Sequence, residues 1–222
     1  MPVTLHVWRV PRRAAGPALL RMAAGRRRRP GVRFAKFLGT GTGVGFGPGD
    51  ADLTRWAALT VSDHPVTYPG WDRLSVARVT VDLDPLTSRG RWSGRQPFGD
   101  PVARRADGMV LALTRARLRP TRALTFWRAI PPVARELAAA PGLIARFGIG
   151  EAPIGWQGTI SLWRDSADLT RFAYRQPEHR AVIARTPADR WYAEELFARF
   201  AVQAVTGDRA VLGWREEGQT EA

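Results

Sequence analysis

The sequence predicts an α+β fold in which two ferredoxin-like halves, each with the order β-α-β-β-α-β, close into one barrel within a single chain. The first observation is a repeat: Pro-Gly followed by Ala, a basic residue and Phe occurs at 30–37 and again at 141–147. From Gly31 to Gly142 the offset is 111 residues, half of the 222-residue chain. The second observation is that each copy follows a predicted strand and helix, which indicates a duplicated unit and not a solenoid.

Residues 1–83 are expected to form the first half of a single domain, 1–222. Its second helix is expected to be reduced to the turn around Trp71, because 62–69 is short and rich in turn-forming residues. Alternation of polar and apolar residues, together with helix-end signals, predicts the other elements. These are a strand at 3–10, a helix at 14–24 that ends at Gly25, and strands at 55–61 and 76–83.

Residues 109–212 are expected to form the second and fuller half. A connector at 84–108, rich in Pro, Gly and Arg, precedes it, and a polar tail at 213–222 follows it. Asp165 or Ser166 can cap a helix in this half. The other elements predicted here are a strand at 110–118, a helix at 125–139, a strand at 159–163 and an aromatic-rich last element at 191–200.

The composition excludes several kinds of site and partner. No cysteine is present, which excludes disulfides, iron–sulfur clusters and a thiolate-ligated haem. No apolar run approaches the ~20 residues of a membrane-spanning helix, and the first residues lack the apolar core of a signal peptide, so a cytoplasmic protein is expected. The net charge of +14 is typical of nucleic-acid binding, but Lys36 is the only lysine, which indicates a coding bias toward arginine. No nucleic acid is therefore expected as a partner, and peripheral contact with anionic lipid headgroups is the preferred interpretation.

Motifs of several enzyme classes are missing from the sequence. The glycine run at 39–45 does not follow the dinucleotide-binding pattern, because Val44 occupies the third glycine position and no helix follows. Neither the G-x-S-x-G motif of hydrolases nor the H-E-x-x-H motif of metalloproteases occurs. A non-haem iron site would need His6 or His64 to converge with His179, and the sequence neither supports nor excludes this arrangement.

His179 is the histidine whose position points most directly to chemistry. It falls on the apolar face of a predicted helix, with Val182 and Ile183 three and four positions later. An imidazole on such a face needs a partner, because a buried unpaired polar group costs about 1–3 kcal/mol. A backbone carbonyl and an iron ion are the two alternatives.

The predicted strands at 3–10 and 159–163 indicate which side chains line a cavity. In each, one face is aliphatic, which suits packing under helices, and the other is polar and aromatic, which suits a lined interior. The common interior is therefore predicted to hold Thr4, His6, Trp8, Thr159, Ser161 and Trp163, and the helix-covered face Leu5, Val7, Ile160 and Leu162.

Several motifs, spread over nearly the whole chain, carry a family resemblance. They are 36–43, 89–94 with Pro97-Phe98, 113–116, 148–153, 159–163 and, after Pro177 and His179, 191–200. Together they resemble the spheroidene monooxygenase family of carotenoid-modifying enzymes. The resemblance implies an α+β barrel of the dimeric α/β-barrel type, haem b as the cofactor, and oxygenation of an acyclic carotenoid.

The same resemblance implies roles for individual residues. His179 would ligate the haem iron. Arg91 and Arg180 suit the haem propionates, and the alternatives are a solvated connector for Arg91 and a solvated arginine face for Arg180. Electrons would come from an external donor such as reduced ferredoxin, so a redox partner protein and a hydrophobic small-molecule substrate are expected. The alternative is a barrel of the same fold that binds haem or an apolar ligand without turnover. The side chains expected to face the reacting centre are His6, Trp8 and Trp163.

Overall fold

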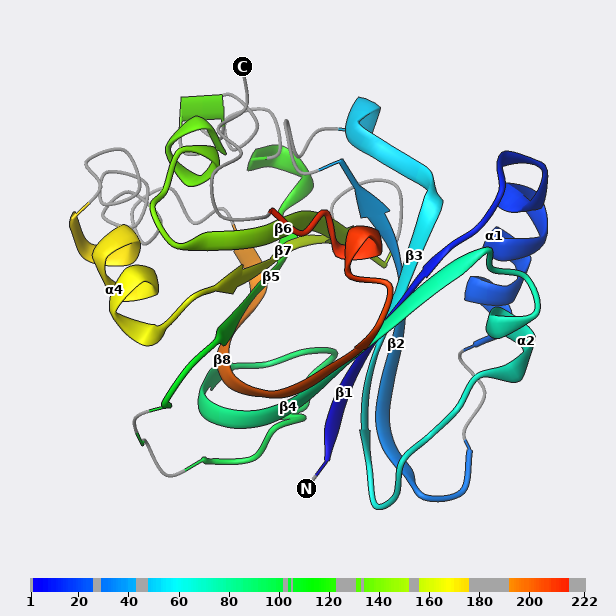
Figure 1. The fold of residues 1–222 in the computed structure, drawn as a ribbon, viewed down its shortest axis with the longest axis horizontal. Helices are drawn as coiled ribbons and strands as arrows, with labels where there is room; N and C mark the ends of the chain where they lie inside the picture. Colours follow the sequence, from blue (N-terminus) through cyan, green and yellow to red (C-terminus); the bar gives the residue numbers. More distant parts are fainter. Residues whose placement is uncertain are drawn as a thin grey trace.

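Eight strands in the described part of the chain form a closed barrel in the order β1-β3-β2-β6-β7-β5-β8-β4 (Figure 1). Every pair of neighbouring strands is antiparallel. The strands are β1 (Val3–Arg9), β2 (Val32–Gly41), β3 (Ala51–Ser62), β4 (Ala77–Gly90), β5 (Val110–Leu118), β6 (Leu143–Gly150), β7 (Trp156–Trp163) and β8 (Tyr192–Gly207). This computed structural model describes residues 2–25, 29–42, 48–101, 104, 106–122, 131–132, 134–151, 156–175 and 192–215.

Helices cover the barrel on two opposite sides. On one side lie α1 (Ala15–Ala24) and the single turn α2 (Pro69–Asp72), and on the other lies α4 (Ser166–Arg175) (Figure 1). The N–H of Asp168 donates to Oδ1 of Asp165 at 2.8 Å, which confirms the predicted cap of α4. The four-residue length of α2 confirms the reduction predicted around Trp71. None of the helices in the described ranges is long and apolar enough to cross a membrane.

The strand order confirms the predicted pair of ferredoxin-like halves. The first half contributes β4-β1-β3-β2 and the second contributes β8-β5-β7-β6, so both have the spatial order fourth, first, third, second. The halves join twice, where β2 pairs with β6 and where β4 pairs with β8. The predicted helix at 125–139 lies partly outside the described residues, and its described part is helical at 131–132 and 134–138.

The repeated Pro-Gly motif occupies the same structural position in both halves. Gly31 and Gly142 stand directly before β2 and β6 with φ of 72° and 78°, a left-handed conformation that favours glycine. The carbonyl of Gly31 accepts from the N–H of Asp63 at 2.9 Å, and that of Gly142 accepts from the N–H of Arg164 at 2.8 Å. Asp63 directly follows β3, the partner of β2, and Arg164 directly follows β7, the partner of β6. The Pro-Gly repeat found in the sequence therefore marks the same turn in both halves.

The interior of the barrel is filled by apolar side chains from all eight strands. Leu5, Val7, Ile160 and Leu162 belong to this interior cluster, each with 3% or less of its surface exposed. Such packing leaves the barrel of eight strands as a solid core and not a channel. Additional members close the two ends: Trp92 and Phe98 from the connector, and Val211 and Leu212 from the short helix η4 (Arg209–Leu212).

The prediction of which strand faces look inward was wrong. Trp8 lies in a second cluster under α1 and α2, and Trp163 lies in a third cluster against α4. Alternation along a strand fixes which side chains share a face but not which face is inside. In β1 and β7 the aliphatic side chains face the barrel interior, and the two tryptophans pack between the barrel and the helices.

Two predicted boundaries also need correction. β4 continues through Gly90, so the connector expected from residue 84 begins seven residues later. Pro85 interrupts the alternation there, but the sheet accommodates it at a register shift between Pro85 and Thr87. The last element, expected at 191–200 from a spacing that suits a helix or a strand, is the strand β8, which continues to Gly207.

We predict that Gly142→Ala destabilises the protein more than Gly31→Ala. Both changes force alanine into a left-handed conformation, at a cost of about 1–2 kcal/mol. A Cβ at residue 142 would also collide with the carboxylate of Asp168, whereas a Cβ at residue 31 meets nothing closer than His64 at 4.0 Å. Urea unfolding of both variants measures the difference. Equal losses of unfolding free energy would contradict the close packing of Asp168 on this turn.

Candidate functional site

His6 and Trp8 lie together on the helix-covered face of β1. The two rings are stacked, with centroids 5.6 Å apart and planes within 7°. Tyr68 meets both rings edge-on, at 5.0 Å from His6 and 5.8 Å from Trp8. Trp71 stacks on the other side of Trp8 at 5.0 Å. We call these four residues, with Phe37, the aromatic cluster.

Polar groups at the border of the aromatic cluster fix its orientation. The indole N–H of Trp8 donates to Oδ1 of Asp72 at 2.9 Å. The hydroxyl groups of Tyr68 and Thr60 are hydrogen-bonded at 2.8 Å, and burial raises the pKa of Tyr68. The guanidinium of Arg29 lies 4.9 Å from the centre of the Tyr68 ring. The positive charge of Arg29 thus lies over the face of the Tyr68 ring.

His6 is the chemically distinctive member of the aromatic cluster. Only 8% of its surface is exposed, and its Nε2 has no hydrogen-bond partner among the described residues. Burial lowers the pKa of His6 from 6.5 to about 4, although the charges of Asp72 and Asp82 act in the opposite direction. The imidazole is therefore neutral at physiological pH. A neutral imidazole can ligate a metal, or donate or accept one hydrogen bond at Nε2.

Two other predicted site residues, Trp163 and Arg91, are not brought to the aromatic cluster. Trp163 packs on Phe172 of α4 with ring centroids 5.3 Å apart, and its indole N–H donates to Oγ of Ser161 at 2.9 Å. Arg91 is exposed and donates to the carbonyl of Gly94 in its own turn at 3.1 Å. His179 and Arg180 lie outside the described residues.

Tyr68 and Trp71 were missed as site residues by sequence reasoning. Both come from the turn-rich segment after β3, where no hydrophobic period singles out a buried side chain. Their burial, at 2% and 3% exposed, follows from the turn α2 folding back onto β1. The one available signal was the pair of aromatic residues flanking Pro69-Gly70.

A second polar site lies inside one end of the barrel. Arg115 of β5 is 1% exposed and donates from Nη2 to Oε1 of Glu151 at 2.8 Å and from Nη1 to Oε1 of Glu194. Lys36 of β2 donates to the other oxygen of Glu151 at 2.5 Å. Burial alone would raise the pKa of Glu151, but its hydrogen bonds and charge contacts with Lys36 and Arg115 outweigh burial and lower it. We call these four residues the barrel ion network.

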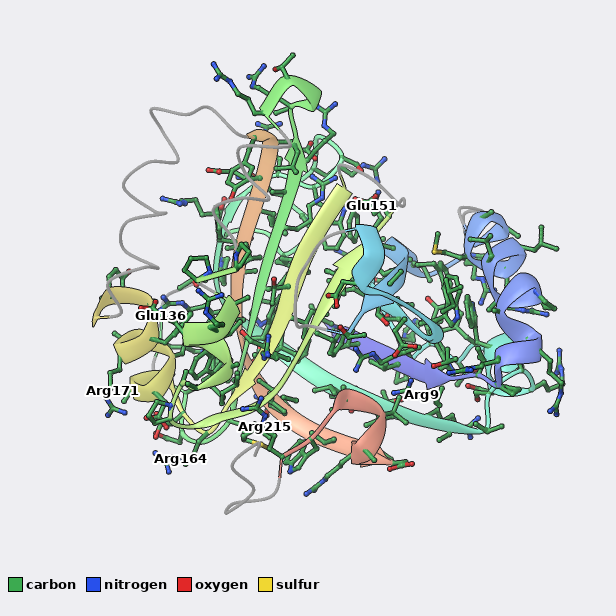
Figure 2. The ribbon with its side chains drawn as sticks, turned by 90° about the horizontal axis from the view of Figure 1, so that it is seen from above. Arg9, Glu136, Glu151, Arg164, Arg171 and Arg215 are labelled. Carbon is green, nitrogen blue, oxygen red and sulfur yellow. The ribbon has the colours of Figure 1, made fainter. Side chains whose placement is uncertain are left out.

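The barrel ion network also holds the connector. The indole N–H of Trp92 donates to Oε1 of Glu151 at 2.7 Å, and the N–H groups of Ser93 and Gly94 donate to the Glu194 carboxylate at 2.9 and 2.8 Å. Glu151 stands just after β6, far from Arg215, which donates to Ile144 near the start of the same strand (Figure 2). The network is thus confined to one end of the barrel.

Comparison with curated proteins gives three relatives, all named spheroidene monooxygenase. The protein of Rhodobacter capsulatus is 33% identical over 191 residues, covering 80% of this chain and 78% of the relative. That of Rubrivivax gelatinosus is 31% identical and covers 80% and 72%. This chain belongs to the spheroidene monooxygenase family. The protein of Cereibacter sphaeroides is 31% identical, and the match covers 58% of its length.

No family model matches the chain. Among solved structures, an aldoxime dehydratase in complex with butyraldoxime has a TM-score of 0.50 at 13% identity, over 90% of this chain and 79% of that chain. A putative monooxygenase from Fusobacterium nucleatum has a TM-score of 0.43 at 10% identity, over 93% and 94%. The first of these supports the fold and nothing further.

Membership of this family makes the protein an oxygenase. Five of the sequence motifs that predicted the family contribute a side chain or an N–H to the barrel ion network or its connector contacts. The contributors are Lys36, Trp92 with Ser93 and Gly94, Arg115, Glu151 and Glu194. The motifs therefore mark the part of the barrel that orders the connector, whereas the aromatic cluster takes only Phe37 from them. Across the described ranges, no group of three or more His, Cys, Asp or Glu is placed to hold a metal ion.

We predict that His6 makes stability depend on pH. The unfolded chain binds a proton near pH 6.5 and the folded chain only near pH 4, so the stabilisation is complete above pH 6.5. As the pH falls from 6.5 to 4, the free energy of unfolding should drop by about 3 kcal/mol because of this residue. His6→Phe keeps an aromatic ring and removes the titration.

Urea unfolding of wild type and His6→Phe between these pH values measures the effect. The difference between the two unfolding free energies should change steadily with pH. His64→Gln, at an exposed histidine, is the matched control and should track wild type. Parallel curves for wild type and His6→Phe would show that His6 is not held neutral.

Proposed function

We propose that this protein is a monooxygenase that inserts oxygen into a hydrophobic polyene, such as an acyclic carotenoid, forming a hydroxyl group and then a ketone. The observation that carries the proposal is its relationship to the spheroidene monooxygenase of Rhodobacter capsulatus, at 33% identity over 191 residues. The relatives' name supplies the substrate class.

We propose haem as the oxygen-activating group: His179 would hold its iron, and Arg91 and Arg180 would meet its propionates. The donor chemistry of the chain fits this group, because it has histidine and no cysteine, and because His6 shows that an imidazole is kept neutral under the helices. When bound, haem supplies activated oxygen, and an external donor such as reduced ferredoxin supplies the electrons.

His6 and Trp8 then have distinct roles in the proposal. The Nε2 of His6 forms a hydrogen bond to the oxygen being transferred, or to the hydroxyl group it becomes, without contributing a charge. The ring of Trp8, fixed by Asp72 and by stacking on Trp71, would hold the stacked His6 ring in place. Trp163 would act in the same indirect way on the helix-covered side of the second half, where it packs against Phe172.

The proposal predicts a haem spectrum and labelled product. Purified protein supplied with haem should show a Soret band, and His179→Ala should weaken or shift it. With an electron donor, an acyclic carotenoid and ¹⁸O₂, the product should carry ¹⁸O by mass spectrometry. Haem uptake without label in any polyene would contradict turnover and favour a binding protein. Labelled product without haem would overturn the cofactor assignment and leave the monooxygenase assignment in place.

A further inference from the structure

We propose that α1 and the residues flanking it form a docking surface for an anionic lipid bilayer. The surface consists of the exposed residues Arg12, Arg13, Leu19, Leu20, Arg21 and Arg29. The inference concerns where the protein works and does not depend on which substrate it oxidises.

The helix α1 packs Ala18 and Met22 against the barrel and leaves Leu19 and Leu20 facing outward. Ala18 is fully buried against the barrel, and Ala14, one turn earlier, is 7% exposed. Leu20 comes about 200° further round the helix than Ala18 and is 73% exposed, and Leu19 is 53% exposed. Packing on the barrel therefore does not account for the leucines. Between Arg13 and Arg21 the outward face carries no charge, which suits insertion into the boundary between headgroups and acyl chains.

The segment of chain that contains α1 carries only positive charge, of which Arg9, Arg33 and Lys36 are paired with carboxylates from elsewhere in the chain. Residues 1–49 contain nine arginines and one lysine and no acidic residue, so +10 of the net +14 lies in this part of the chain. Neither Arg12 nor Arg13 forms an ion pair with a described carboxylate, and the same holds for Arg21 and Arg29. Such arginines are available to anionic headgroups, which attract basic side chains near a membrane surface.

Charge decides between a bilayer and a second copy of this chain as the occupant. Two copies meeting through α1 would bring Arg12, Arg13 and Arg21 of each against those of the other, with no acidic residue of the surface to offset them. An anionic bilayer offers both complementary groups: negative headgroups for the arginines and acyl chains for Leu19 and Leu20.

The test is co-sedimentation of the full chain with vesicles of phosphatidylcholine, with and without about 30% phosphatidylglycerol. We expect binding to the anionic vesicles that weakens with added salt. Leu19→Gln/Leu20→Gln should weaken binding at least tenfold, because it removes the inserted side chains while keeping good helix formers. Tyr174→Gln is the matched control: Tyr174 is 63% exposed on α4, on the opposite side of the barrel, and its loss should change binding less than twofold.

A second pair of variants tests the charges independently. Arg12→Gln/Arg13→Gln should weaken binding to anionic vesicles, whereas Arg122→Gln/Arg135→Gln, exposed arginines of the second half, should weaken it less. No binding to anionic vesicles, or equal binding by all variants, would overturn the proposal. So would a dimer in sedimentation velocity that Leu19→Gln/Leu20→Gln dissociates. These vesicles contain no polyene and no turnover is measured, so failure here leaves the proposed oxygenation untouched.

Discussion

Arg115 can be buried inside the barrel only because two carboxylates accept its hydrogen bonds. A lone guanidinium at 1% exposure would lose its hydration without compensation, and removing one partner of such a pair typically costs about 3–5 kcal/mol. Glu151 stands just after β6 and Glu194 lies on β8. Pairing with both therefore requires β8 to lie beside β5 and the end of β6 to be correctly placed across β7. The same carboxylates hold Trp92 and the turn after it. Barrel closure and connector placement are therefore linked through one charge.

This arrangement divides the molecule into a structural interior and a reactive exterior. The barrel is filled by apolar side chains with the barrel ion network at one end, and that network is internally satisfied. The neutral imidazole of His6, whose Nε2 has no hydrogen-bond partner in the part of the chain that the structure describes, lies outside the barrel, between β1 and the helices. In a fold built from two halves, the space under the helices exists twice. In the first half the aromatic cluster occupies it, and in the second half the cluster around Trp163 does.

The sequence was sufficient for the fold but not for the site. The Gly31 and Gly142 repeat revealed the duplication because a left-handed turn leaves a local mark, and the strand predicted at 110–118 matches β5. The sequence could not show which face of each strand points into the barrel, because the alternation along a strand is the same for either choice. Nor could it show the pairing of Lys36 with Glu151, 115 residues apart, since that pairing arises only when β2 meets β6.

The central claim is that His6, and not merely the fold around it, takes part in the oxygenation. The most direct test is the steady-state oxygenation rate of His6→Phe, compared with wild type and with His64→Gln at equal concentrations of folded protein. The account predicts at least a tenfold lower kcat for His6→Phe, the size expected when a positioned hydrogen-bonding group is removed, and a normal kcat for His64→Gln. A wild-type kcat in folded His6→Phe would contradict it, because the aromatic cluster would then serve only to pack the helices onto the barrel.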